Sequence, residues 1–148
     1  MFKNILVPVD GSERSKAAVK QACSFAQESG ARLTFYYAIP GYLPDYISGE
    51  IALGFVYPDA AFVAAMNKQA DAILRDAVQA ATDAGVTFET LVTEYNSPYE
   101  GIIAAAASKA CDLIFMASHG ARGASALLLG SETHKVLTHC KIPVLVYR

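Results

Sequence analysis

Residues 3–12 read KNILVPVDGS, and this stretch indicates how the chain folds. The apolar run over 3–9 is typical of a buried strand, and Asp10-Gly11-Ser12 supplies the residues of a turn. Ser12 is a good N-cap for a helix over 12–29, which Gly30 would end. A buried strand that turns directly into a helix is how an α/β fold with parallel strands begins.

Strands and helices continue to alternate along the rest of the chain. Further strands are expected over 32–39, 86–94, 112–117 and 142–147, and further helices over 59–84, over 98–109 with Ser97 as its cap, and from 131 onward. This alternation predicts parallel pairing, right-handed crossovers and helices on both faces of the sheet. The fold class is therefore α/β, with residues 1–148 forming a single Rossmann-like domain around an open five-stranded parallel sheet.

Two strands are expected at the edges of this sheet. Polar and apolar residues alternate over 86–94, so one face of that strand is wetter than the other. The last strand contains Pro143. Proline cannot donate a hydrogen bond to a neighbouring strand, so within a sheet it is tolerated at an edge, where one side has no neighbour.

The composition excludes several classes of protein. With 148 residues and 53% apolar content, the chain can bury one hydrophobic core and is not expected to be disordered. A net charge of −2 offers no basic surface for nucleic acid. No run resembles a signal peptide or a membrane span, so we expect a soluble, cytoplasmic protein. Its three cysteines contain no CxxC pair and are expected to be small buried hydrophobes.

The connection over 40–58 is long for a compact domain and rich in aromatic and aliphatic residues. Two interpretations stay open. The segment is either a folded surface flap that covers its own core, or a lid over a ligand or a surface for a regulatory partner.

Two expected strand ends carry unusual residues. Asp10-Gly11-Ser12 follows the first strand, and Ser118-His119-Gly120 follows the fourth. Ligands of open parallel sheets bind beyond the carboxyl ends of the strands. The second loop runs on to Gly130-Ser131, where a helix start would offer unpaired N–H groups to an anion and glycine would allow close approach. This suits a phosphate chain, although Gly-Ser before a helix is also common as a simple cap.

The whole arrangement resembles the universal stress protein family over essentially all of the chain. The nucleotide-binding branch of that family carries Gly, two residues, Gly, nine residues, and then Gly followed by Ser or Thr. Gly120, the spacer 121–129 and Gly130-Ser131 match this pattern, whereas Ala117 replaces its first glycine. If that position needs positive φ or contact closer than a methyl group allows, binding is weakened or lost.

The resemblance implies an adenine nucleotide as the ligand, either ATP or AMP, with Mg²⁺ or Mn²⁺ held by the phosphates and not by protein side chains alone. Asp10 would hold the nucleoside, Val9 and Met116 would line a slot for the ring, and His119 and Arg122 would add positive charge. The full set of expected nucleotide-binding residues is Pro8, Val9, Asp10, Ser12, Ala38, Ile39, Met116, Ala117, His119, Gly120, Arg122, Gly130, Ser131, Glu132 and Thr133.

Within this set, the backbone near Ala38 and Ile39 would read the adenine edge, and the phosphates would lie among Gly120, Gly130, Ser131 and Thr133. The residues alone leave two alternatives open: Asp10 as a cap of the first helix, and His119 as a loop histidine bonded to backbone.

The resemblance further implies an adenine nucleotide α-hydrolase-like fold and a regulatory protein of the stress response. It implies a homodimer formed through residues 142–147. No catalytic residues are expected, because the chain lacks GxxxxGK[ST], GxSxG and HExxH. Two alternatives stay open: a dimeric interaction module that binds no nucleotide, and a slow ATPase or autophosphorylating protein.

Overall fold

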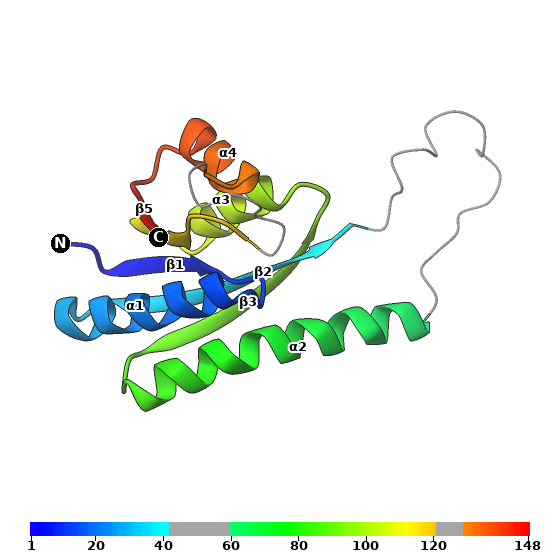
Figure 1. Ribbon diagram of the computed structural model, residues 1–148, viewed down its shortest axis with the longest axis horizontal. Helices are drawn as coiled ribbons and strands as arrows, with labels where there is room; N and C mark the ends of the chain where they lie inside the picture. The colour runs from blue at the N-terminus through cyan, green and yellow to red at the C-terminus, as the bar shows by residue number, and fades with distance from the viewer. Residues whose placement is uncertain (42–59, 121–128) are drawn as a thin grey trace.

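The computed structural model describes residues 1–41, 60–120 and 129–148. Strands and helices alternate along these ranges, as Figure 1 shows. In chain order they are β1 (Asn4–Pro8), α1 (Glu13–Ser29), β2 (Arg32–Pro40), α2 (Ala60–Asp83), β3 (Phe88–Tyr95), α3 (Pro98–Ser108), β4 (Leu113–Ala117), α4 (Ser131–His139) and β5 (Val144–Tyr147). Most of the predicted 40–58 flap, and Arg122, lie outside the described residues.

The strands form one five-stranded sheet in the order β3-β2-β1-β4-β5, and every pair is parallel. The predicted α/β fold class and both predicted edge strands are thereby confirmed. Chain order reverses direction between β1 and β4, which makes their carboxyl ends the switch point of the sheet.

Two strands start two residues later than the sequence pattern predicts. β3 begins at Phe88 instead of at residue 86, and β5 begins at Val144 instead of at residue 142. In β5 the preceding Pro143 offers only its carbonyl to the ladder, which accepts from the N–H of Ile114 at 2.9 Å.

Local residue chemistry sets the ends of α1 as predicted. The Ser12 side chain accepts a hydrogen bond from the N–H of Ser15 at 3.1 Å, which satisfies one of the unpaired N–H groups at the helix start. Gly30 ends the helix with φ 65°, a left-handed conformation that favours glycine.

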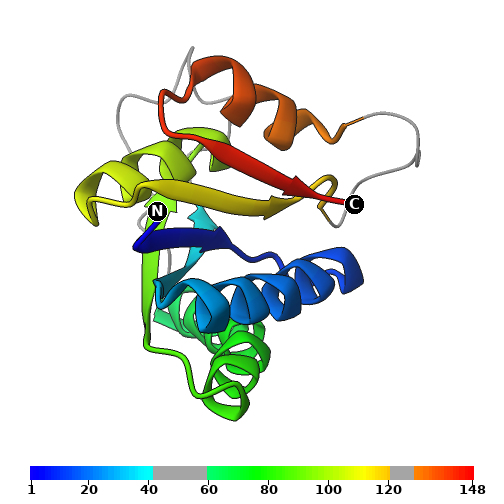
Figure 2. The same cartoon turned by 90° about the vertical axis from the view of Figure 1, so that its left-hand side faces the viewer.

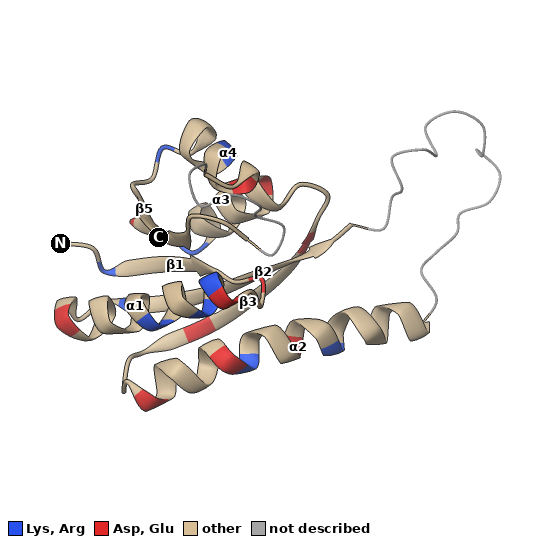
Figure 3. Cartoon of the chain, viewed as in Figure 1, with Lys and Arg blue, Asp and Glu red and all other residues tan. Residues whose placement is uncertain are grey.

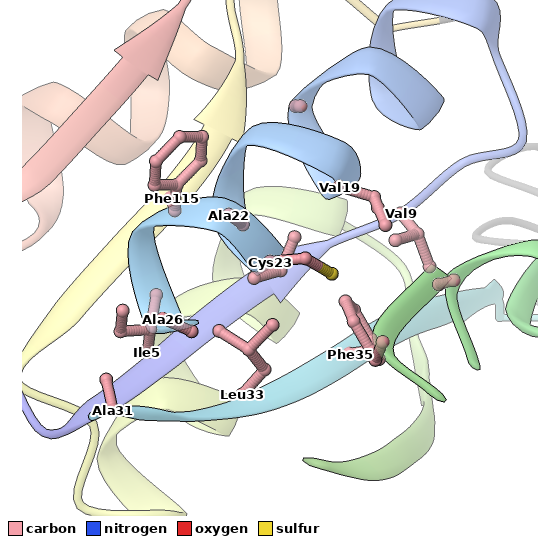
Figure 4. Close-up of a cluster of buried hydrophobic side chains, with 14 of the residues drawn as sticks. Ile5, Val9, Val19, Ala22, Cys23, Ala26, Ala31, Leu33, Phe35 and Phe115 are labelled. Carbon is pink, nitrogen blue, oxygen red and sulfur yellow. The ribbon is translucent and has the colours of Figure 1, made fainter. Parts of the chain in front are cut away.

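The two faces of the sheet have separate cores. Helices α1 and α2 cover one face, and α3 and α4 cover the other (Figure 1, Figure 2). The first core joins Ile5, Val9, Leu33 and Phe35 of the sheet to α1, as the close-up in Figure 4 shows. The second core is built around Leu6, Tyr36, Ile114 and Met116 with side chains of α3 and α4. The alternation of side chains along each strand divides the residues between the cores.

Within the described ranges, we find no helix that combines the length and the apolar character needed to cross a membrane.

Candidate functional site

The predicted site residues gather where β1 and β4 end. Because these two strands are neighbours, the turn from β1 into α1 and the residues directly after β4, 118–120, lie at the same edge of the sheet. Two helix starts therefore face this edge, and each carries partial positive charge on its unpaired N–H groups.

Asp10 closes the turn after β1. Its Oδ1 accepts a hydrogen bond from the N–H of Ser12 at 2.9 Å, and its own N–H donates to Ser15 Oγ at 3.2 Å. These bonds hold the carboxylate at the start of α1, as the capping interpretation predicts. They also fix its direction, since the second oxygen lies beside the loop that follows β4.

Gly120 is the loop residue that meets this carboxylate. A Cβ atom at Gly120 would lie 2.5 Å from Asp10 Oδ2, closer than real Cβ atoms come to any heavy atom. The two residues, 110 positions apart in the chain, are thus in close contact, and a side chain at residue 120 would require the carboxylate or the loop to shift.

Gly130 closes the other end of the loop. Its N–H donates to the carbonyl of Ser118 at 2.8 Å. A Cβ atom at Gly130 would lie 3.2 Å from both this carbonyl and the Cα of His119. The small size of glycine therefore lets α4 start directly against the end of β4.

Thr133 has a different role from the predicted one. Its side chain is 2% exposed, and its hydroxyl donates to the carbonyl of Ala117 at 3.1 Å. This bond connects α4 to β4. It uses the one proton that the hydroxyl has to donate, so the hydroxyl cannot also donate to a phosphate. Among the predicted phosphate ligands of α4, Ser131 is exposed, and the N–H groups of the first turn have no acceptor within the helix.

The side chain of Glu132 also turns away from the predicted phosphate position. Its Oε2 accepts a hydrogen bond from the N–H of Tyr99 in the first turn of α3, at 2.8 Å. Ser97, which the sequence predicted as the cap of α3, makes no side-chain capping bond. Glu132 caps α3 in its place, a role that sequence analysis missed because the two residues are 33 positions apart.

Ala117 fits its position without strain. Ala110 is the one non-glycine residue with positive φ in the described part of the chain. The φ of Ala117 is therefore not positive, and its backbone is not left-handed. The Ala117 methyl group is 8% exposed and belongs to the core under α1 and α2. The side chain of Ala117, which replaces the family glycine, thus points into the core. In this geometry its methyl group does not crowd the candidate site.

The two side chains of the predicted ring slot belong to different cores. Val9, directly after β1, belongs to the core beneath α1 and α2, and Met116 belongs to the core beneath α3 and α4. The slot between them stays a prediction. Ala38 packs on the same side as Met116, and Ile39 is half-buried at the end of β2.

His119 is buried and 5% exposed. Its Nδ1 lies 3.0 Å from Ser118 Oγ, so the partner is a side chain and not the predicted backbone group. Its Nε2 is buried and has no hydrogen-bond partner among the residues described. A buried polar atom of this kind is usually satisfied by a ligand or an ordered water.

Tyr37 is a residue near the site that sequence analysis did not single out. Burial first, and then the negative charge of Asp10, raise the pKa of its phenol above the ordinary value. Tyr37 directly precedes Ala38, a predicted site residue, in β2, and this neighbourhood in the sequence could have indicated that Tyr37 lies near the site.

The described parts of the chain hold no group of three or more His, Cys, Asp or Glu side chains arranged to bind a metal ion. The residues do fit an anionic ligand. The glycines bring backbone to this edge without side chains, and the helix start supplies N–H donors. A nucleotide here would be held by Gly120, Gly130 and the first turn of α4 beside Asp10.

Comparison with known proteins places the chain in a family. The model of the Universal stress protein family matches residues 1–148. A universal stress protein from Thermus aquaticus, encoded in the QAH/OAS sulfhydrylase 3' region, is 32% identical over 148 residues, with all of both chains covered.

Solved structures of universal stress proteins resemble the fold closely. A family protein from Burkholderia pseudomallei superposes with a TM-score of 0.74 at 25% identity, covering 98% of this chain and 95% of that one. A universal stress protein in complex with cAMP gives a TM-score of 0.74 at 25% identity, with 99% and 97% covered. The chain therefore belongs to the universal stress protein family.

Proposed function

We propose that the protein binds an adenine nucleotide at the edge formed by the ends of β1 and β4, as a regulatory protein and not as a fast enzyme. The observation that carries the proposal is the pair of glycines, Gly120 and Gly130, packed where a side chain would collide with Asp10, Ser118 or His119. A similar protein of the same family has been solved with cAMP.

The described geometry supports some of the expected contacts more than others. The N–H groups at the start of α4 are suited to a phosphate, and we expect Asp10, whose Oδ2 lies beside Gly120, to accept a hydrogen bond from a hydroxyl of the ligand. The apolar wall for the base would include Met116 and Ala38, which belong to one core.

Titration calorimetry on the protein, freed of any nucleotide that co-purifies, tests the proposal. AMP, ATP with and without Mg²⁺, and GTP form the series. Saturable heat with adenylates, stronger than with GTP, is the expected result. Heat from none of them at millimolar concentration would contradict the proposal and favour an interaction module that binds no nucleotide. Phosphate release from ATP over hours in the same samples would reveal slow hydrolysis.

We also propose a homodimer that pairs the β5 strands of two copies. β5 is an edge strand (Figure 2). All four of its residues are half-buried. The carbonyls of Pro143 and Tyr147 accept hydrogen bonds from β4, so the N–H and C=O groups of Val144 and Val146 point away from it. These are the groups that a second strand would bind.

The variant Val146→Pro removes one outward N–H without removing a bond to β4. Sedimentation analysis should show the variant shifted toward monomer while its thermal transition stays close to that of the wild type. A wild-type protein that is monomeric at all concentrations would refute the dimer. The cytoplasmic location stays a prediction from the sequence.

A further inference from the structure

The first turn of α4, where we propose that a phosphate binds, contains the carboxylate of Glu132. Glu132 is the second residue of this helix, within the turn whose N–H groups would meet a phosphate. Its Oε2 accepts from the N–H of Tyr99 at 2.8 Å, and its Oε1 lies 2.9 Å from the Lys135 ammonium. The carboxylate is thus held in place from two directions, and Figure 3 shows α4 carrying both an acidic and a basic segment.

This carboxylate weakens the attraction of the helix start for anions. A negative side chain in the first turn already interacts with the partial positive charge of the N–H groups. Lys135 offsets part of its charge, and the hydrogen bond to Glu132 raises the pKa of that ammonium, which keeps it charged. Asp10 adds a second carboxylate at the same edge, against Gly120.

The repulsion that a ligand meets grows with its own negative charge. At neutral pH and above, cAMP carries about −1, AMP about −2 and metal-free ATP about −4, since the second ionisation of a phosphate monoester lies near pH 6. One unit of ligand charge about 10 Å from Glu132 in a watery site changes affinity by about twofold.

We propose that Glu132 determines the ligand class of this site, making it favour adenine nucleotides with a single phosphate group over a free triphosphate. The inference rests on the proposed nucleotide binding and adds to it a preference based on charge. The Glu132 side chain is hydrogen-bonded to α3 and does not itself touch the ligand. It therefore acts on specificity through its charge.

The variant Glu132→Gln tests the inference, because glutamine keeps an oxygen for the N–H of Tyr99 while it removes the charge. Calorimetry at low salt and pH 8 should show tighter binding by about twofold for cAMP, about fourfold for AMP and about sixteenfold for metal-free ATP. Mg²⁺ reduces the charge of ATP, so the gain for ATP with Mg²⁺ should fall to about that of AMP. The gains should shrink in 0.5 M salt, because screening weakens them.

Glu28→Gln is the matched control. It makes the same change in net charge at an exposed residue in the last turn of α1, at the end of the helix away from the candidate site. It should leave all affinities unchanged. Equal gains for all ligands, or none, in Glu132→Gln would overturn the inference while leaving nucleotide binding intact. If neither wild type nor variant binds any nucleotide, the proposed function fails and the inference fails with it.

Discussion

Gly120 lies directly against the carboxylate of Asp10, so that a methyl group on residue 120 would come within 2.5 Å of Oδ2. The contact joins the turn after β1 to the loop after β4. Asp10 is held at the start of α1 by the bond from Ser12, so a side chain at residue 120 would have to displace this carboxylate or the loop backbone.

The first prediction concerns this contact. Gly120→Ala should weaken adenylate binding at least about tenfold, because the added methyl group must displace Asp10 or the loop. Gly120 is exposed and its φ is not left-handed, so the free energy of unfolding should change by less than about 1 kcal/mol. Calorimetry and urea denaturation measure the two effects. Unchanged affinity would show that the ligand does not use this surface.

The second prediction concerns Ala117, where the family glycine is missing. Ala117→Gly should not tighten nucleotide binding, because the methyl group faces the core under α1 and α2. It should lower the free energy of unfolding by about 1 kcal/mol through lost packing and added chain freedom. Calorimetry beside chemical denaturation decides between this and the alternative, in which the variant binds distinctly more tightly than wild type.

The third prediction concerns Gly101 in α3. A Cβ atom there would collide with the hydroxyl of Tyr36, which is bonded to Thr93 Oγ1 at 2.8 Å. Gly101→Ala should therefore destabilise the protein by about 1–3 kcal/mol.

The matched background for that variant is Tyr36→Phe, which removes the hydroxyl. In this background Gly101→Ala should cost distinctly less than in the wild type, as a double-mutant cycle by denaturation would report. Additive costs would mean that the hydroxyl is not the obstacle, leaving the ring of Tyr95, 3.1 Å from the same Cβ position, as the source of the strain.

The fourth prediction is a pH dependence. The hydrogen bond from Lys109, at 2.7 Å, lowers the pKa of the Glu89 carboxyl below its ordinary 4.5, against the opposing effect of burial. A lowered pKa in the folded state stabilises the protein above pH 4.5, and this contribution is lost as the pH falls through the lowered value. Since Glu89 is 37% exposed, screening keeps the contribution below about 1 kcal/mol.

Lys109→Met should remove most of this dependence. Urea denaturation at pH 7 and pH 3 should show that the wild type loses more stability on acidification than the variant does. Equal losses for the two proteins would show that the acid sensitivity does not come from the pair of Lys109 and Glu89.

Sequence analysis predicted the features that depend on near neighbours in the chain. Ser12, Gly30 and the alternation of strands and helices act locally, so the element order and the edge strands followed from them. The cap of α3 did not follow, because Glu132 reaches it from another helix.

The separation of Val9 and Met116 between the two cores had an available signal. Counting alternate residues along two paired strands would have placed the side chains on opposite faces. The burial of His119 and the use of the Thr133 hydroxyl depended on how closely α4 packs on β4, which no local pattern reveals.

The location of the nucleotide is the central claim, and a titration of isotope-labelled protein with AMP, followed by amide NMR spectra, tests it most directly. Binding as proposed should shift the amide signals of Asp10, Gly120, Gly130 and Ser131 in a saturable manner. A groove of about 450 Å³ between α1 and α2, spanned by the 3.0 Å ion pair of Lys16 with Asp76, provides the contrast. Shifts confined to that groove, or no shifts at millimolar AMP, would contradict the account.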